Sequence, residues 1–144
     1  MKIFFDMDGT IANLYGVENW LENLRAENTK PYETAKVLLN MNSFAKVLHK
    51  LQNKGHEIGI ISWTSKGGST AYNEAVKTAK LRWLHTHLAS VNFNEIHIVD
   101  YGTPKEIFAK SENDILFDDE EKNRNSWKGI AYNETEILKV LRGI

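Results

Sequence analysis

The residues best suited to chemistry lie near the N-terminus, where the apolar segment Ile3–Phe5 ends in Asp-Met-Asp-Gly-Thr. At the end of a strand, the carboxylates of Asp6 and Asp8 project to the same side because they are two residues apart. Gly9 allows the backbone to turn sharply away from them. With a hard cation such as Mg2+ bound by oxygen ligands, one carboxylate can attack phosphorus while the other exchanges protons with the leaving group. The same residues also fit a strand that simply ends in a turn.

A second apolar segment, Ile115–Phe117, also ends in carboxylates, beginning with Asp118 and Asp119. In a parallel sheet, ligands bind in the crevice beyond the carboxyl ends of the strands. If both apolar segments are strands of one such sheet, the two acidic pairs meet in that crevice. Taken alone, the second pair also fits a solvated turn, so the indication of a site comes from the repeated pattern.

A third apolar run, His56–Ile61, leads to Ser62 and then to Trp63 and Thr64 in a loop rich in hydroxyl groups and glycine. This loop suits the binding of an oxyanion. It lacks the P-loop signature, and it also fits an ordinary connector rich in glycine and serine.

A candidate cation follows a fourth run, Glu95–Val99. Pro104 is expected to start a short helix, with Lys105 at its beginning. Lys80 is the alternative, but it lies well inside a long predicted helix. The sequence therefore favours Lys105 over Lys80 as the cation of the site.

These candidates require a sheet whose strands end at one edge, and the chain alternates accordingly between apolar runs and helical patterns. Helices are expected from Ser43 to just before Gly55, over 71–87, and after a last short strand at 130–132. The alternation predicts an α/β fold, a three-layer Rossmann-like parallel sheet with helices on both faces.

Residues 13–42 separate the first strand from the first of these helices, and we expect them to form a small helical cap over the carboxylates. Apolar residues recur at helical spacing from about 17 to 27. A second short helix is expected around 34–39, and no strand. Trp20 belongs to the apolar stripe and is expected in the core, which leaves Tyr15 as the better candidate for stacking on a substrate ring.

Composition limits the classes of protein. The 144 residues suit one domain over 1–144, and the net charge of -1 gives no general attraction to nucleic acid or anionic membrane. The absence of cysteine excludes disulfides and thiolate chemistry. No apolar run approaches the roughly 20 residues of a membrane span, and Asp6 interrupts the N-terminus too early for a secretory signal. We expect a soluble, cytoplasmic protein without a membrane or nucleic-acid partner.

Together, the motifs resemble those of the haloacid dehalogenase-like (HAD-like) superfamily of phosphohydrolases. The DMDGT segment resembles the first motif, the strand ending in Ser62 the second, Lys105 the third and ILFDD the fourth. The resemblance spans nearly the whole chain and implies a central first strand. Among the members, the 5′(3′)-deoxyribonucleotidases are the most similar in layout, because they also carry a modest cap after the first motif.

The resemblance implies specific roles. Asp6 would be the nucleophile that forms an aspartyl-phosphate, and Asp8 the general acid and base. Ser62 would bind a phosphoryl oxygen, and Lys105 would neutralise charge on the nucleophile and phosphate. The residues expected to line the phosphate and substrate positions are Gly9, Thr10, Tyr15, Ser62, Trp63, Thr64 and Lys105.

The resemblance also implies Mg2+ as the cofactor. Its ligands would be Asp6, Asp8 through its backbone carbonyl, and the pair Asp118 and Asp119. Asp119 is the expected direct ligand and Asp118 its support, although the sequence alone does not order them.

The expected function is that of a Mg2+-dependent phosphomonoesterase acting on a small phosphorylated metabolite, such as a (deoxy)nucleoside monophosphate. Two alternatives remain open: a phosphatase acting on nucleic-acid ends or phosphoproteins, and a catalytically silent module that binds phosphate. The sequence does not predict the oligomeric state.

Overall fold

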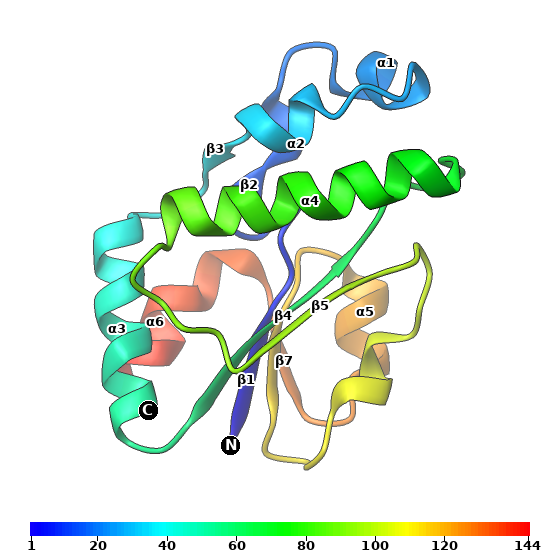
Figure 1. Ribbon diagram of the computed structural model, residues 1–144. Helices are drawn as coiled ribbons and strands as arrows, with labels where there is room; N and C mark the ends of the chain where they lie inside the picture. Colours follow the sequence, from blue (N-terminus) through cyan, green and yellow to red (C-terminus); the bar gives the residue numbers. More distant parts are fainter.

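A computed structural model describes all 144 residues and contains a five-stranded, entirely parallel sheet (Figure 1). The strand order is β5-β4-β1-β6-β7, so β1 is central, with Ile3 paired to Ile58 on one side and to Ile115 on the other. The strands are β1 (Lys2–Phe5), β4 (Glu57–Trp63), β5 (Glu95–Val99), β6 (Ile115–Phe117) and β7 (Ile130–Tyr132). The predicted α/β, Rossmann-like parallel sheet is confirmed.

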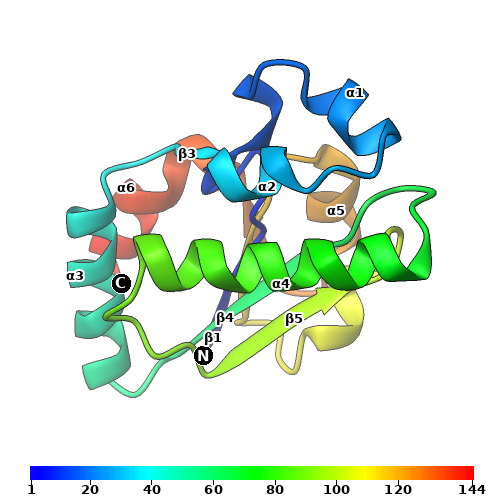
Figure 2. The same cartoon turned by 45° about the horizontal axis from the view of Figure 1, so that its top comes forward.

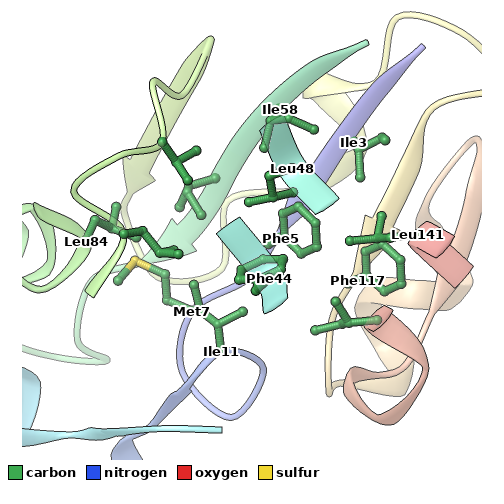
Figure 3. Packing of buried hydrophobic residues seen from close by; sticks show 14 of the residues in the cluster. Ile3, Phe5, Met7, Ile11, Phe44, Leu48, Ile58, Leu84, Phe117 and Leu141 are labelled. Carbon is green, nitrogen blue, oxygen red and sulfur yellow. The ribbon is translucent and has the colours of Figure 1, made fainter. Parts of the chain in front are cut away.

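Side chains of β1 alternate between two apolar layers, as a strand buried on both faces requires. Ile3 and Phe5 point into the larger core, where Phe5 stacks on Phe117 at 5.1 Å between ring centroids and meets Phe44 edge-on at 5.0 Å (Figure 3). The helices that cover this face are α3 (Met41–Asn53), α4 (Thr70–His87) and α6 (Ile137–Arg142).

The opposite face carries a smaller apolar cluster around Phe4. Its ring meets Trp127 edge-on at 5.8 Å, and Ile61 and Leu116 complete the contact. The elements bordering this face are the 3-10 helix η2 (Lys105–Phe108) and α5 (Glu121–Ser126). In Figure 1, α3 and α6 accordingly lie on one side of the sheet and α5 on the other.

The segment expected as a purely helical cap is mixed. Two short strands pair antiparallel, contrary to the expectation of none, because the chain leaving the first motif and the chain returning to α3 run side by side. The predicted helices at 17–27 and 34–39 were wrong in their bounds. The elements are β2 (Ala12–Asn13), η1 (Leu14–Gly16), α1 (Trp20–Arg25), α2 (Lys30–Thr34) and β3 (Lys36–Val37).

Backbone conformation and helix capping explain where these helices begin and end. Asn19 and Glu27 adopt left-handed conformations, with φ of 56° and 55°, and bracket α1 tightly. Pro31 stands in the first turn of α2, where its missing N–H costs nothing, so it starts a helix rather than ending one. The helix α3 begins before the predicted start at Ser43, because Asn40 is the N-cap and its side chain accepts a hydrogen bond from the Ser43 amide.

The insertion packs along α4, and Figure 2 shows α2 over the middle of that helix. Leu14 and Tyr32 pack against Tyr72, Val76 and Ala79 of that helix. Three polar contacts reinforce the packing: the Tyr72 hydroxyl donates to Asn28 O at 3.0 Å, Trp83 Nε1 to Ala35 O at 2.8 Å, and the Ser69 amide and hydroxyl to the Glu27 carboxylate, both at 2.8 Å.

None of the helices combines the length and the apolar character needed to cross a membrane.

One buried carboxylate has a purely structural environment. Asp114, just before β6, accepts backbone hydrogen bonds from Lys2 at 2.9 Å, Lys110 at 2.8 Å and Ser111 at 3.0 Å. It thereby joins the start of β1 to the turn before β6.

We expect Asp114→Asn to lower the free energy of unfolding by about 1.5–3 kcal/mol, because the amide offers one acceptor oxygen to three donors and loses the charge. Urea denaturation measures the change. Glu112→Gln, an exposed carboxylate in the same turn, is the control and should change stability by less than about 0.5 kcal/mol. Equal stabilities for the two variants would contradict this account.

Candidate active site

Asp6 stands immediately after β1, where its amide donates to Phe117 O at 2.9 Å across to β6. Its carboxylate is held from two sides. Lys105 Nζ lies 2.9 Å from Oδ1, and Thr10 Oγ1 lies 3.1 Å from Oδ2. The side chain lines a pocket while the residue as a whole is nearly buried. A carboxylate in this position is fixed in orientation and faces incoming ligands.

Three carboxylates converge beyond the ends of β1 and β6. Oxygens of Asp6, Asp118 and Asp119 all lie within 4.8 Å of one another. Burial, and after it the charge of Asp6, raises the pKa of both Asp118 and Asp119. Like charges held this closely favour a bound cation, and an all-oxygen donor set matches the preference of Mg2+.

The two neighbouring aspartates differ in how far their oxygens are already engaged. Asp118 is fully buried and accepts hydrogen bonds from the Glu120 amide at 2.9 Å, Lys105 Nζ at 2.7 Å and Asn123 Nδ2 at 3.1 Å. Asp119 is less buried, and its only side-chain hydrogen bond is with Thr10 Oγ1 at 3.2 Å. Asp119 therefore has more capacity to ligate a cation directly.

Asp8 lines the same pocket but its carboxylate is not part of the acidic cluster. Its Oδ2 accepts a hydrogen bond from Lys80 Nζ at 2.7 Å. Burial raises the pKa of Asp8, and the charge of Lys80 opposes this rise. The side chain is thus separated from the acidic cluster. Only the backbone carbonyl of Asp8 could still act as a ligand to a cation there.

Two lysines contact site carboxylates: Lys105, which the sequence favours, and Lys80, its alternative. Lys105 contacts Asp6 and Asp118. Burial lowers the pKa of Lys105, but the charges of those two carboxylates outweigh it and leave the pKa raised. Lys80 reaches Asp8 from inside α4, because that helix crosses the ends of β1 and β4.

Ser62 does not occupy the position expected for a phosphate ligand. It is fully buried, its hydroxyl accepts a hydrogen bond from Lys80 Nζ at 2.7 Å, and it does not line the pocket. Thr64 does line it, and Thr64 Oγ1 is a buried polar atom without a hydrogen-bond partner. Among the hydroxyls at the end of β4, that of Thr64 is thus the one without a hydrogen-bond partner.

Gly9 and Thr10 support the carboxylates instead of lining the pocket. Gly9 has φ of +80°, and a Cβ at this position would collide with the Asp119 carboxylate. The Thr10 hydroxyl lies between Asp6 and Asp119, at 3.1 and 3.2 Å from their oxygens. These two residues hold the acidic cluster together.

The pocket has a volume of about 240 Å³ and aromatic walls. On the insertion side, Tyr15 and Trp20 meet edge-on at 5.0 Å between ring centroids. On the sheet side, Trp63 packs against Tyr101 at 4.9 Å, with Lys105 Nζ 5.2 Å from the Trp63 ring.

Trp20 was expected in the core, but it is only half-buried and lines the pocket, because α1 is too short to bury a face. Tyr15 lines the pocket as expected. Tyr101, Glu120 and Asn123 also line it, and sequence reasoning did not single out any of them. For Tyr101 and Glu120 the available signal was their position shortly after a strand end, whereas Asn123 lies within α5 and gave no such signal.

No protein-family model matches the chain, and no curated protein matches it in sequence.

Proposed function

We propose that this protein is a Mg2+-dependent phosphomonoesterase that works through an aspartyl-phosphate on Asp6. The observation that carries the proposal is the pairing of two pocket carboxylates with different surroundings. Asp6 belongs to the acidic cluster and contacts Lys105, whereas Asp8 is separated from that cluster and paired with Lys80. Two carboxylates held in distinct environments suit a nucleophile and an acid–base partner.

In this mechanism an oxygen of Asp6 attacks phosphorus and the bond to the leaving oxygen breaks. Asp8 donates a proton to that oxygen. A water molecule then attacks the phosphoryl group on Asp6, Asp8 takes the proton from that water, and Asp6 and inorganic phosphate are released. The Lys105 ammonium and the unpartnered Thr64 hydroxyl supply hydrogen-bond donors to the phosphoryl oxygens.

Asp6, Asp119 and Asp118 would hold the magnesium ion, with the Asp8 carbonyl as a further oxygen ligand. When bound, the ion supplies positive charge that offsets the phosphoryl oxygens and the crowded carboxylates. Thr10 keeps Asp6 and Asp119 together for this purpose.

A (deoxy)nucleoside monophosphate is the substrate class best supported. Aromatic residues stand on both sides of the pocket, so a planar leaving group can stack while its phosphate reaches Asp6. In a catalytically silent binding module, the Asp8 carboxylate in the pocket would have no function.

The proposal is tested by hydrolysis of 4-nitrophenyl phosphate with Mg2+ and by its loss with a chelator. Metal binding is followed independently through Tm. Because the pKa values of Asp118 and Asp119 are raised, we expect the metal-free protein to lose stability as the pH rises above the ordinary carboxyl range of about 4. Mg2+ stabilises the ionised carboxylates, so it should raise Tm more at about pH 8 than at about pH 5. No hydrolysis and no Mg2+-dependent change in Tm would overturn the proposal.

We expect Tyr15→Ala to lower kcat/KM for a deoxynucleoside monophosphate by roughly 5- to 150-fold, since one stacking ring contributes about 1–3 kcal/mol. Hydrolysis of a sugar phosphate should change little, because a sugar offers no flat ring. Leu38→Ala, at an exposed residue of the insertion outside the pocket, is the control. Equal rates on both substrates in the parent protein would favour a general phosphatase.

A further inference from the structure

Lys80 is a buried lysine that contacts one carboxylate of the pocket, that of Asp8. It is 1% exposed, and its ammonium lies 2.7 Å from Asp8 Oδ2, 2.7 Å from Ser62 Oγ and 2.6 Å from Trp63 O. Resting on the function proposed above, we infer that Lys80 is a positioning residue that sets the orientation of Asp8 for proton transfer to the leaving group.

The contacts of Lys80 exclude direct binding of substrate. An ammonium group has three donors, and Asp8, Ser62 and Trp63 use all three. Lys80 also does not line the pocket, whereas Lys105 does. The positive charge of Lys80 therefore acts on the phosphoryl transfer only through the carboxylate that it holds.

The ion pair fixes which oxygen of Asp8 is available. Lys80 is the only hydrogen-bond partner of the Asp8 side chain, and it contacts Oδ2. Oδ1 is consequently the oxygen left to exchange a proton with the leaving group.

Lys80 is itself held firmly. Two of its partners belong to β4, and its Nζ lies 5.2 Å from the ring centroid of Tyr32 in the insertion. Through Lys80, the position of Asp8 is thus fixed relative to the sheet, to α4 and to the insertion.

Each of the two buried lysines contacts a different one of the two carboxylates proposed to react. Lys105 contacts Asp6, and Lys80 contacts Asp8. A defect at Lys80 should therefore weaken acid catalysis without removing the nucleophile, and this difference can be measured.

The experiment compares Lys80→Met on two substrates of different leaving-group basicity. Glycerol phosphate leaves as an alkoxide and needs a proton, whereas 4-nitrophenol leaves readily without one. Because kcat/KM reports only the steps up to departure of the leaving group, it excludes the later hydrolysis of the phosphorylated Asp6, which is common to both substrates. Misplacing a reacting group by about 1 Å can cost about 100-fold, so we expect kcat/KM on glycerol phosphate to fall roughly 100-fold. The fall in kcat/KM on 4-nitrophenyl phosphate should be at least 10-fold smaller, because its leaving group needs little acid catalysis.

Lys77→Met, at an exposed lysine of the same helix, is the matched control and should leave both rates unchanged. Ser62→Ala removes one anchor of Lys80 without touching the pocket, and a smaller selective loss on glycerol phosphate is expected. If Lys80→Met does not fold, Ser62→Ala decides the question.

Equal losses of kcat/KM on the two substrates would overturn the role of Lys80 and leave the proposed phosphatase intact. A parent protein that hydrolyses neither substrate would instead overturn the proposed function, and the role of Lys80 with it.

Discussion

Asp6→Asn is expected to abolish turnover of 4-nitrophenyl phosphate. An amide is a poor nucleophile and a weaker metal ligand than a carboxylate. The substitution is nearly isosteric, and its remaining oxygen can still accept a hydrogen bond from Lys105, so the fold should persist. Intact-protein mass spectrometry after acid quenching should detect no phosphorylated chain in this variant.

Asp114→Asn provides the matched control for this result. Asp114 is also a buried carboxylate with several donors, but it lies outside the pocket. Its variant should retain parental activity per folded molecule. Parental turnover by Asp6→Asn would exclude the aspartyl-phosphate mechanism altogether.

Asp8→Asn is expected to reduce kcat by roughly 100- to 10,000-fold, the range typical of lost general acid–base catalysis. The two steps of the reaction separate in this variant. With 4-nitrophenyl phosphate, phosphorylation of Asp6 proceeds without a strong acid, but attack by water then lacks its base. We therefore expect a phosphorylated chain to accumulate, the opposite of the result for Asp6→Asn.

The measurement for Asp8→Asn is again mass spectrometry of the acid-quenched protein, together with release of 4-nitrophenol in the first turnover. The amide oxygen can still pair with Lys80, and thermal unfolding shows whether the fold is kept. A variant that turns over alkyl phosphates at the parental rate would remove Asp8 from the mechanism.

The sequence predicted the sheet and its acidic edge because those features depend on short local patterns. Ile3–Phe5 and Ile115–Phe117 are apolar runs buried on both faces, and a parallel sheet brings their carboxyl ends together. Asp6 and Asp118 meet for that reason alone.

The strand that leads to Ser62 was predicted to end too early. The hydroxyl expected to bind a phosphoryl oxygen was therefore assigned to Ser62. β4 continues to Trp63, so Thr64 rather than Ser62 is the first residue beyond the sheet. Both residues follow an apolar run, and only the length of the pairing with β5 decides between them. That pairing is a tertiary property.

Lys80 and Trp20 show a second limit. A lysine within a helix is predicted to be a solvated charge unless the partner that neutralises it is known. The partner of Lys80 is Asp8, which lies 72 residues away in sequence. Trp20 fits an apolar stripe, but Asn19 and Glu27 confine α1 to six residues, which bury no face. In both cases the decisive contact is remote or depends on backbone conformation.

The attachment of the insertion to α4 has a consequence for protein engineering. Exchanging the insertion is the obvious way to give the pocket a different specificity, because it supplies Tyr15 and Trp20. The graft junction cannot simply be placed where β2 and β3 begin and end, since α4 also carries Lys80. A transplanted segment that lacks counterparts of the α4-facing groups would disturb proton transfer as well as specificity. The groups to be retained are the Glu27 carboxylate, the Asn28 and Ala35 carbonyls and the Tyr32 ring.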